Sequence, residues 1–81
     1  NSLLSKIDEI RQLVLDLKPH VVCLSETKID SSVTNAEVHI EGYSTIRRDR
    51  SRHGGGVACY VNNSIHYNEN LFYYLNYLHY Y

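Results

Sequence analysis

The feature that most constrains the fold of this chain is the apolar run Val-Val-Cys-Leu at residues 21–24. Strands that are buried on both faces lack the alternation of half-exposed strands, so this run predicts the central strand of a parallel or mixed sheet under helices. Glu26 follows where the strand would end. Ligands of open α/β sheets bind beyond the carboxyl ends of the strands, which makes Glu26 a candidate site residue. A solvated loop carboxylate is the alternative.

An amphipathic helix is expected before this strand. Apolar residues recur there at helical spacing, at Ile7, Ile10, Leu13, Val14 and Leu17. The pattern predicts a helix over residues 6–17 with Ser5 as N-cap, whose apolar face packs on the sheet. Pro19 disfavours the helical conformation at Lys18, so a tight turn should deliver the chain into the strand.

The second half of the chain contains a predicted antiparallel hairpin. Residues 27–36 are rich in Ser, Thr, Asp and Asn and predict a surface loop, and residues 38–43 predict a short extended segment. Residues 57–61 are a strong strand candidate behind a Gly-rich connection. The connection lacks the Gly-Lys-Ser/Thr of a phosphate loop, and its His-Gly-Gly-Gly string lacks the nucleophile elbow of an esterase.

Arginines cluster in this connection. Arg47, Arg48, Arg50 and Arg52 supply four of the eight Lys and Arg residues of the chain. Arginine can hold a phosphate with two donors at once, so the cluster predicts a nucleic-acid contact. The alternative is a solvated loop that Asp49 partly neutralises.

Charge and cysteine usage narrow the function classes. A formal charge of -1 argues against a general polyanion binder. Cys23 and Cys59 lie in apolar strand-like runs, which favours reduced thiols and a nuclear or cytoplasmic, non-secreted protein, with a Cys23–Cys59 disulfide as the alternative. No apolar run approaches the roughly 20 residues of a membrane span. Residues 67–81 hold six of the eight tyrosines and form a Tyr-rich tail, for which a helix is the preferred prediction.

Three motifs in order carry a resemblance to a known family. They are Asn1-Ser2-Leu3-Leu4-Ser5-Lys6-Ile7-Asp8-Glu9-Ile10, Val21-Val22-Cys23-Leu24-Ser25-Glu26-Thr27-Lys28, and Gly42-Tyr43 through Arg47-Arg48-Asp49-Arg50 to His53-Gly54-Gly55-Gly56-Val57-Ala58-Cys59-Tyr60. Residues 1–66 thereby resemble the N-terminal part of the endonuclease domain of non-LTR (LINE-type) retrotransposons, in the endonuclease/exonuclease/phosphatase superfamily. The Tyr-rich tail at residues 67–81 lies outside the resemblance.

The resemblance implies an α/β fold, as part of a four-layer α/β sandwich in which two mixed sheets pack under outer helices. It implies Mg²⁺- or Mn²⁺-dependent nicking of DNA, with Glu26 as the metal-binding glutamate and hence a catalytic residue. Carboxylate oxygens are the ligands that such hard cations prefer. Half of such a sandwich would leave one sheet face uncovered, from which self-association is expected.

Several family motifs have no counterpart in this sequence. The family's functional asparagine lies about two positions before Asn1, and its Asp-x-Asn and Ser-Asp-His motifs are absent from residues 67–81. Without the histidine no general base is identified, so the resemblance predicts a fragment that is inactive alone. A non-catalytic remnant and a small module that binds nucleic acid or a partner through the arginines are the alternatives.

Overall fold

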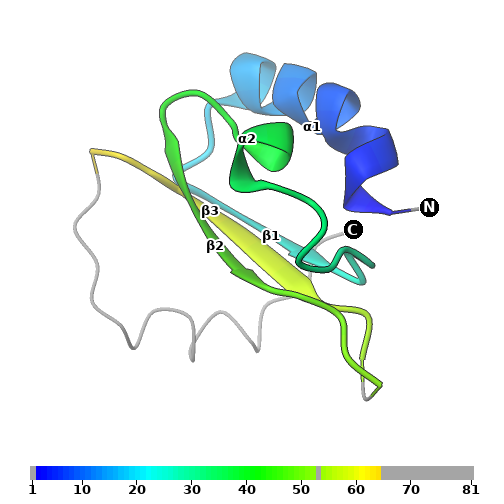
Figure 1. The fold of residues 1–81 in the computed structure, drawn as a ribbon. Helices are drawn as coiled ribbons and strands as arrows, with labels where there is room; N and C mark the ends of the chain where they lie inside the picture. Colours follow the sequence, from blue (N-terminus) through cyan, green and yellow to red (C-terminus); the bar gives the residue numbers. More distant parts are fainter. Residues whose placement is uncertain (1, 53, 65–81) are drawn as a thin grey trace.

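A computed structural model of the chain describes residues 2–52 and 54–64. The elements follow in the order α1 (Leu3–Leu17), β1 (Val21–Ser25), α2 (Asn35–Val38), β2 (Tyr43–Arg48) and β3 (Val57–Asn62). The strands form one sheet in the order β1-β3-β2, and both pairings are antiparallel. Both helices lie on the same face of this sheet (Figure 1). The described residues thus have a mixed α/β architecture, as the sequence predicts in general terms.

Helix α1 begins three residues before its predicted start. Ser2 is the N-cap, not Ser5, whose hydroxyl donates to the Ser2 carbonyl at 2.8 Å. The apolar face buries Leu3, Ile7 and Val14, whereas Leu17 is 65% exposed. Leu17 fails to reach the core because it is the last helical residue, and Lys18 turns the chain away with a positive φ of 49°.

Strands β1 and β3 are neighbours in the sheet. Val21 pairs with Val61 and Ser25 with Val57 along an antiparallel ladder. Strand β3, however, is the central strand, and β1 lies at one edge of the described sheet. An uninterrupted apolar run does not distinguish a central strand from an edge strand that is buried by packing on its faces. The parallel pairing expected for β1 is not seen among the described residues.

The hairpin of β2 and β3 is confirmed, with Tyr43 paired to Asn62 and Arg48 to Val57. The loop expected over residues 27–36 instead ends in the short helix α2. Thr34 caps this helix, since its hydroxyl accepts from the Glu37 N–H while the Glu37 carboxylate accepts from the Thr34 N–H. Val38 therefore belongs to a helix and not to the predicted extended segment.

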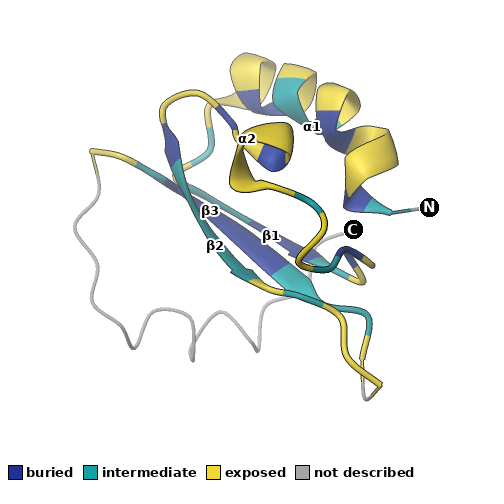
Figure 2. Ribbon diagram, viewed as in Figure 1, coloured by how far each residue is buried: buried dark blue, intermediate teal, exposed yellow. Residues whose placement is uncertain are grey.

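The main core lies between the helices and the sheet (Figure 2). Tyr60 stands at its centre, fully buried, and its hydroxyl donates to the Val38 carbonyl at 2.7 Å. Burial raises the pKa of Tyr60 to about 12. The opposite sheet face carries a smaller cluster around the buried pair Cys23 and Cys59. Self-association through that face stays a prediction.

Candidate functional site

Glu26 lies at the exit of β1, where the sequence predicts it. Its side chain is exposed, and its backbone has a φ of 56°, in the left-handed region that non-glycine residues rarely adopt. The carboxylate lies against the backbone of Gly55. A Cβ added at Gly55 would stand 2.8 Å from Glu26 Cδ and 3.3 Å from Glu26 Cα, so a larger residue there would displace the carboxylate from its present position.

Backbone hydrogen bonds fix the turn that carries Glu26. The Thr27 N–H donates to the Gly56 carbonyl at 3.3 Å, and the Lys28 N–H donates to the Gly55 carbonyl at 2.6 Å. On the other side, the Leu3 N–H donates to the Thr27 carbonyl at 2.8 Å. The exit of β1 is therefore held between the start of α1 and the residues that lead into β3.

The same turn has unfavourable features. Lys28, like Glu26, is a non-glycine residue with positive φ, at 55°. Between them Thr27 is 2% exposed, and its Oγ1 has no hydrogen-bond partner among the described residues. Positive φ at non-glycine residues and unsatisfied buried hydroxyls each cost on the order of 1 kcal/mol or more, and such costs concentrate at functional sites.

A cleft of about 290 Å³ opens beside this turn. It lies between the N-terminal half of α1 and the exit of β1, and its polar lining residues are Ser2, Lys6, Ser25, Glu26, Thr27 and Lys28. The cleft therefore has one carboxylate and two ammonium groups in its walls. Neither lysine was singled out from the sequence, because an isolated Lys on a helix or in a loop carries no pattern.

Glu26 meets only part of what a binding site for a hard divalent cation requires. Within residues 2–52 and 54–64, no three His, Cys, Asp or Glu side chains are grouped as a metal site would require. Mg²⁺ keeps several waters and can be held through one or two carboxylates. The donor chemistry of Glu26 suits such an ion, but one carboxylate beside two lysines supplies too little negative charge for tight binding.

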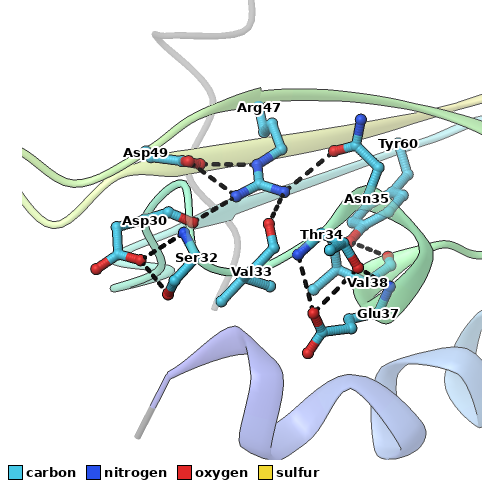
Figure 3. A network of polar contacts seen from close by, with 10 residues as sticks. All are labelled: Asp30, Ser32, Val33, Thr34, Asn35, Glu37, Val38, Arg47, Asp49 and Tyr60. Atoms are coloured by element: carbon cyan, nitrogen blue, oxygen red, sulfur yellow. Dashed lines mark hydrogen bonds and ion pairs between the residues drawn. The ribbon is translucent and has the colours of Figure 1, made fainter.

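Arg47 is held in a network of polar contacts with Asp49 and the segment around Val33 (Figure 3). Its guanidinium donates twice to the Asp49 carboxylate, at 2.8 Å each, and also to the carbonyls of Val33 and Asp30 and to Asn35 Oδ1. These bonds use all five N–H donors of an arginine. The hydrogen bonds to Asp49 raise the pKa of Arg47 further. Arg47 therefore has no donor left for a phosphate.

The other three predicted arginines are exposed. Arg50 lies 3.4 Å from an Asp30 carboxylate oxygen, in an ion pair whose two side chains are about half exposed. Hydrogen bonds from Ser32 lower the pKa of Asp30 and keep it ionised. Arg48 and Arg52 also lie on the surface, at the end of β2 and in the connection to β3. Of the four predicted arginines, Arg48, Arg50 and Arg52 are thus exposed, and their contact with nucleic acid stays a prediction.

Comparisons of the chain with protein-family models, with curated proteins and with solved structures find no match. Neither helix in the described part of the chain has the length and apolar character needed to cross a bilayer. The sequence prediction for residues 67–81 lies outside the described residues.

Proposed function

We propose that residues 1–66 are part of a Mg²⁺-dependent DNA endonuclease domain of the retrotransposon type, with Glu26 as its metal ligand. The observation that carries this proposal is the position of Glu26 in the structure. The carboxylate stands at the carboxyl end of a strand, against a glycine whose missing side chain leaves it room, on a turn with unfavourable backbone geometry. Such a turn persists only where its surroundings over-determine it.

The motif order supports the same proposal. The motif that contains Glu26 and the motif that contains Gly55 are far apart in the sequence, and the resemblance rests on both. In the structure they lie side by side, paired along β1 and β3 and joined beyond the strands by backbone hydrogen bonds from Thr27 and Lys28. The four-layer sandwich that the resemblance implies belongs to this proposal, since three antiparallel strands under two helices account for one sheet only.

A bound Mg²⁺ would stabilise negative charge on the phosphate and on the leaving oxygen. Glu26 would hold that ion through its carboxylate oxygens. A water nucleophile also needs a general base, whose loss costs on the order of 10²- to 10⁴-fold in rate. The family's histidine motif has no counterpart here, so the 81-residue chain should bind the metal weakly and should not nick DNA.

Paramagnetic Mn²⁺ tests the metal site. Added to the folded chain, it should broaden the amide NMR signals of residues 26–28 before others. Glu26→Gln should abolish this local broadening, whereas Glu9→Gln, at an exposed glutamate on α1, should leave it unchanged. Broadening that survives Glu26→Gln would contradict the proposal.

Plasmid relaxation with Mg²⁺ tests the activity of the chain. We expect supercoiled plasmid to remain intact with the wild type and with Glu26→Gln alike. Nicking by the wild type that Glu26→Gln abolishes would mean that another residue of this chain supplies the base. Glu26 would then keep its role, but the claim that the chain is inactive alone would be wrong.

A nucleic-acid-binding module is the second candidate, favoured by the exposed arginines on the connection between β2 and β3. Three phosphate contacts predict a log–log salt dependence of DNA affinity with a slope of about −3. Fluorescence anisotropy with a DNA duplex at several salt concentrations measures it. The triple change of Arg48, Arg50 and Arg52 to Gln should remove binding, and an unchanged affinity would exclude this surface.

A further inference from the structure

The two cysteines of the chain face each other across adjacent strands. Cys23 of β1 is the register partner of Cys59 of β3. Both are free, and they are 2% and 0% exposed. Their thiols are within hydrogen-bonding reach of one another, in a cluster separate from the main core. Neither thiol takes part in the Glu26 site.

The hydrogen-bond pattern shows which kind of pair they form. The Asn62 N–H donates to the His20 carbonyl at 2.9 Å, so His20 and Asn62 are a hydrogen-bonded pair of the antiparallel ladder. Hydrogen-bonded and non-hydrogen-bonded pairs alternate along such a ladder. Counting three residues along β1 makes Cys23 and Cys59 a non-hydrogen-bonded pair. Cα atoms in these pairs are about 4.5 Å apart, within the range that a disulfide spans.

We propose that Cys23 and Cys59 are a site of reversible oxidation, which forms a cross-strand disulfide in exchange with a low-molecular-weight disulfide such as oxidised glutathione. One thiolate attacks the glutathione disulfide and releases one reduced glutathione. The second cysteine then attacks the protein sulfur of the mixed disulfide and releases the other. Two S–H bonds are lost, one S–S bond forms, and the glutathione disulfide is reduced to two thiols.

The surroundings of the two cysteines make this exchange slow while β1 and β3 remain paired. Burial raises the pKa of Cys23, and burial together with the Cys23 thiol raises the pKa of Cys59 to about 12. Only the thiolate attacks a disulfide, and it must also be accessible. Oxidation and reduction therefore both proceed through a transient opening of β1 from β3.

The Cys23–Cys59 disulfide would link the two strands that lead to the Glu26 turn and to the glycines. Cys23 lies three residues before Glu26, and Cys59 lies three residues after Gly56. A disulfide between them prevents the separation of β1 from β3. Oxidation thereby fixes the contact between the Glu26 turn and the glycines, whatever reaction or ligand the site serves.

A thermodynamic cycle tests the proposal on the wild-type chain. The equilibrium constant for disulfide formation with glutathione is measured in buffer and in strong urea, by acid quenching, alkylation and peptide mapping. A bond that fits the native geometry should form on the order of 10²-fold more favourably in the folded chain. By linkage, the oxidised protein should have a folded-to-unfolded ratio larger by the same factor.

The expected product has lost two hydrogen atoms and contains a linked Cys23–Cys59 peptide. Cys59→Ala is the control, in which oxidant should leave the unfolding midpoint unchanged. Should that variant not fold, the wild-type cycle still decides. A native equilibrium constant equal to or below the denatured one, or glutathione adducts as the stable native product, would overturn the proposal.

Discussion

The Arg47 network and the Glu26 turn fix neighbouring parts of the chain in opposite ways. Around Arg47, five N–H donors meet five acceptors from Asp30, Val33, Asn35 and Asp49. Around Glu26, two non-glycine residues have positive φ and a buried hydroxyl has no partner among the described residues. In the Arg47 network every donor of the arginine is paired. The Glu26 turn, by contrast, keeps an unfavourable backbone conformation because hydrogen bonds to neighbouring segments hold it in place.

This difference indicates that the Arg47 network stabilises the fold, whereas the Glu26 turn is available to bind a ligand. A saturated arginine side chain rigidifies the segment from Asp30 to Asn35 against β2 but offers nothing to a ligand. A strained turn with an exposed carboxylate contributes little to stability and is available for binding. Three substitutions and an acid titration test this difference between the two regions.

Arg47→Ala should have the largest effect. Its side chain is mostly buried, and its loss leaves the Asp49 carboxylate and the carbonyls of Val33 and Asp30 without their donor. Truncating one partner of a buried charged network costs about 3 kcal/mol or more. Urea unfolding of the variant measures the loss of free energy of unfolding.

Arg50→Ala is the matched control for Arg47→Ala, because it removes an arginine from the same connection. Its ion pair with Asp30 is exposed and should be worth less than about 1 kcal/mol. Equal losses for the two variants would mean that Arg47 is not the support described here.

Gly56→Ala should follow, with a loss of about 2 kcal/mol. Gly56 has a φ of 93°, and an added Cβ would stand 2.7 Å from Thr27 Oγ1 and 2.9 Å from the Arg50 backbone nitrogen. The left-handed conformation alone costs an alanine about 1–2 kcal/mol. Gly54→Ala, with nothing within 4 Å of its added Cβ, should be nearly neutral, and urea unfolding of both variants measures the difference.

Thr27→Val should stabilise the protein by about 1 kcal/mol. The change replaces a buried hydroxyl, unpaired within the described residues, by a methyl group of similar shape. Thr27→Ser keeps the hydroxyl and loses the methyl group, so it should destabilise. A loss of stability in Thr27→Val would reveal a hydrogen-bond partner for the hydroxyl.

Acid should produce the smallest effect, through Asp30 and Glu37. Hydrogen bonds from Ser32 lower the pKa of Asp30, and those from Thr34 lower the pKa of Glu37. Their stabilising contribution is complete above the ordinary carboxyl pKa of about 4 and is lost as the pH falls through the folded-state values. Thermal unfolding between pH 7 and 2 should show this decline, and Glu37→Gln should flatten part of it.

The sequence predicts the elements whose apolar patterns are strong. Helix α1, strand β1 and the hairpin of β2 and β3 follow from periodicity, because burial on one helical face or along a strand imposes that pattern. The edge position of β1 does not follow, since strand order depends on partners that lie far apart in the chain. Helix α2 does have a signal, the capping box of Thr34 and Glu37, within a segment whose polar composition otherwise indicates a loop.

The candidate site is less predictable than the fold. The position of Glu26 after β1 is readable, but its contact with Gly55 joins residues that only the antiparallel ladder brings together. The arginine cluster is misleading for a similar reason. Arg47 and Arg48 are adjacent in sequence, yet alternation along β2 turns Arg47 toward Asp30 and Val33 while Arg48 stays exposed.

The hydrogen bonds beyond β1 show that the regular pairing with β3 stops at Ser25. Regular continuation of the pairing of Val21–Ser25 with β3 would set Glu26 opposite Gly56, yet it is the Thr27 N–H that bonds to the Gly56 carbonyl. The chain therefore leaves the ladder at Glu26, whose positive φ bends the backbone away from the line of β1. A single residue thus supplies both the carboxylate and the bend that presents it, so neither can be deleted without the other.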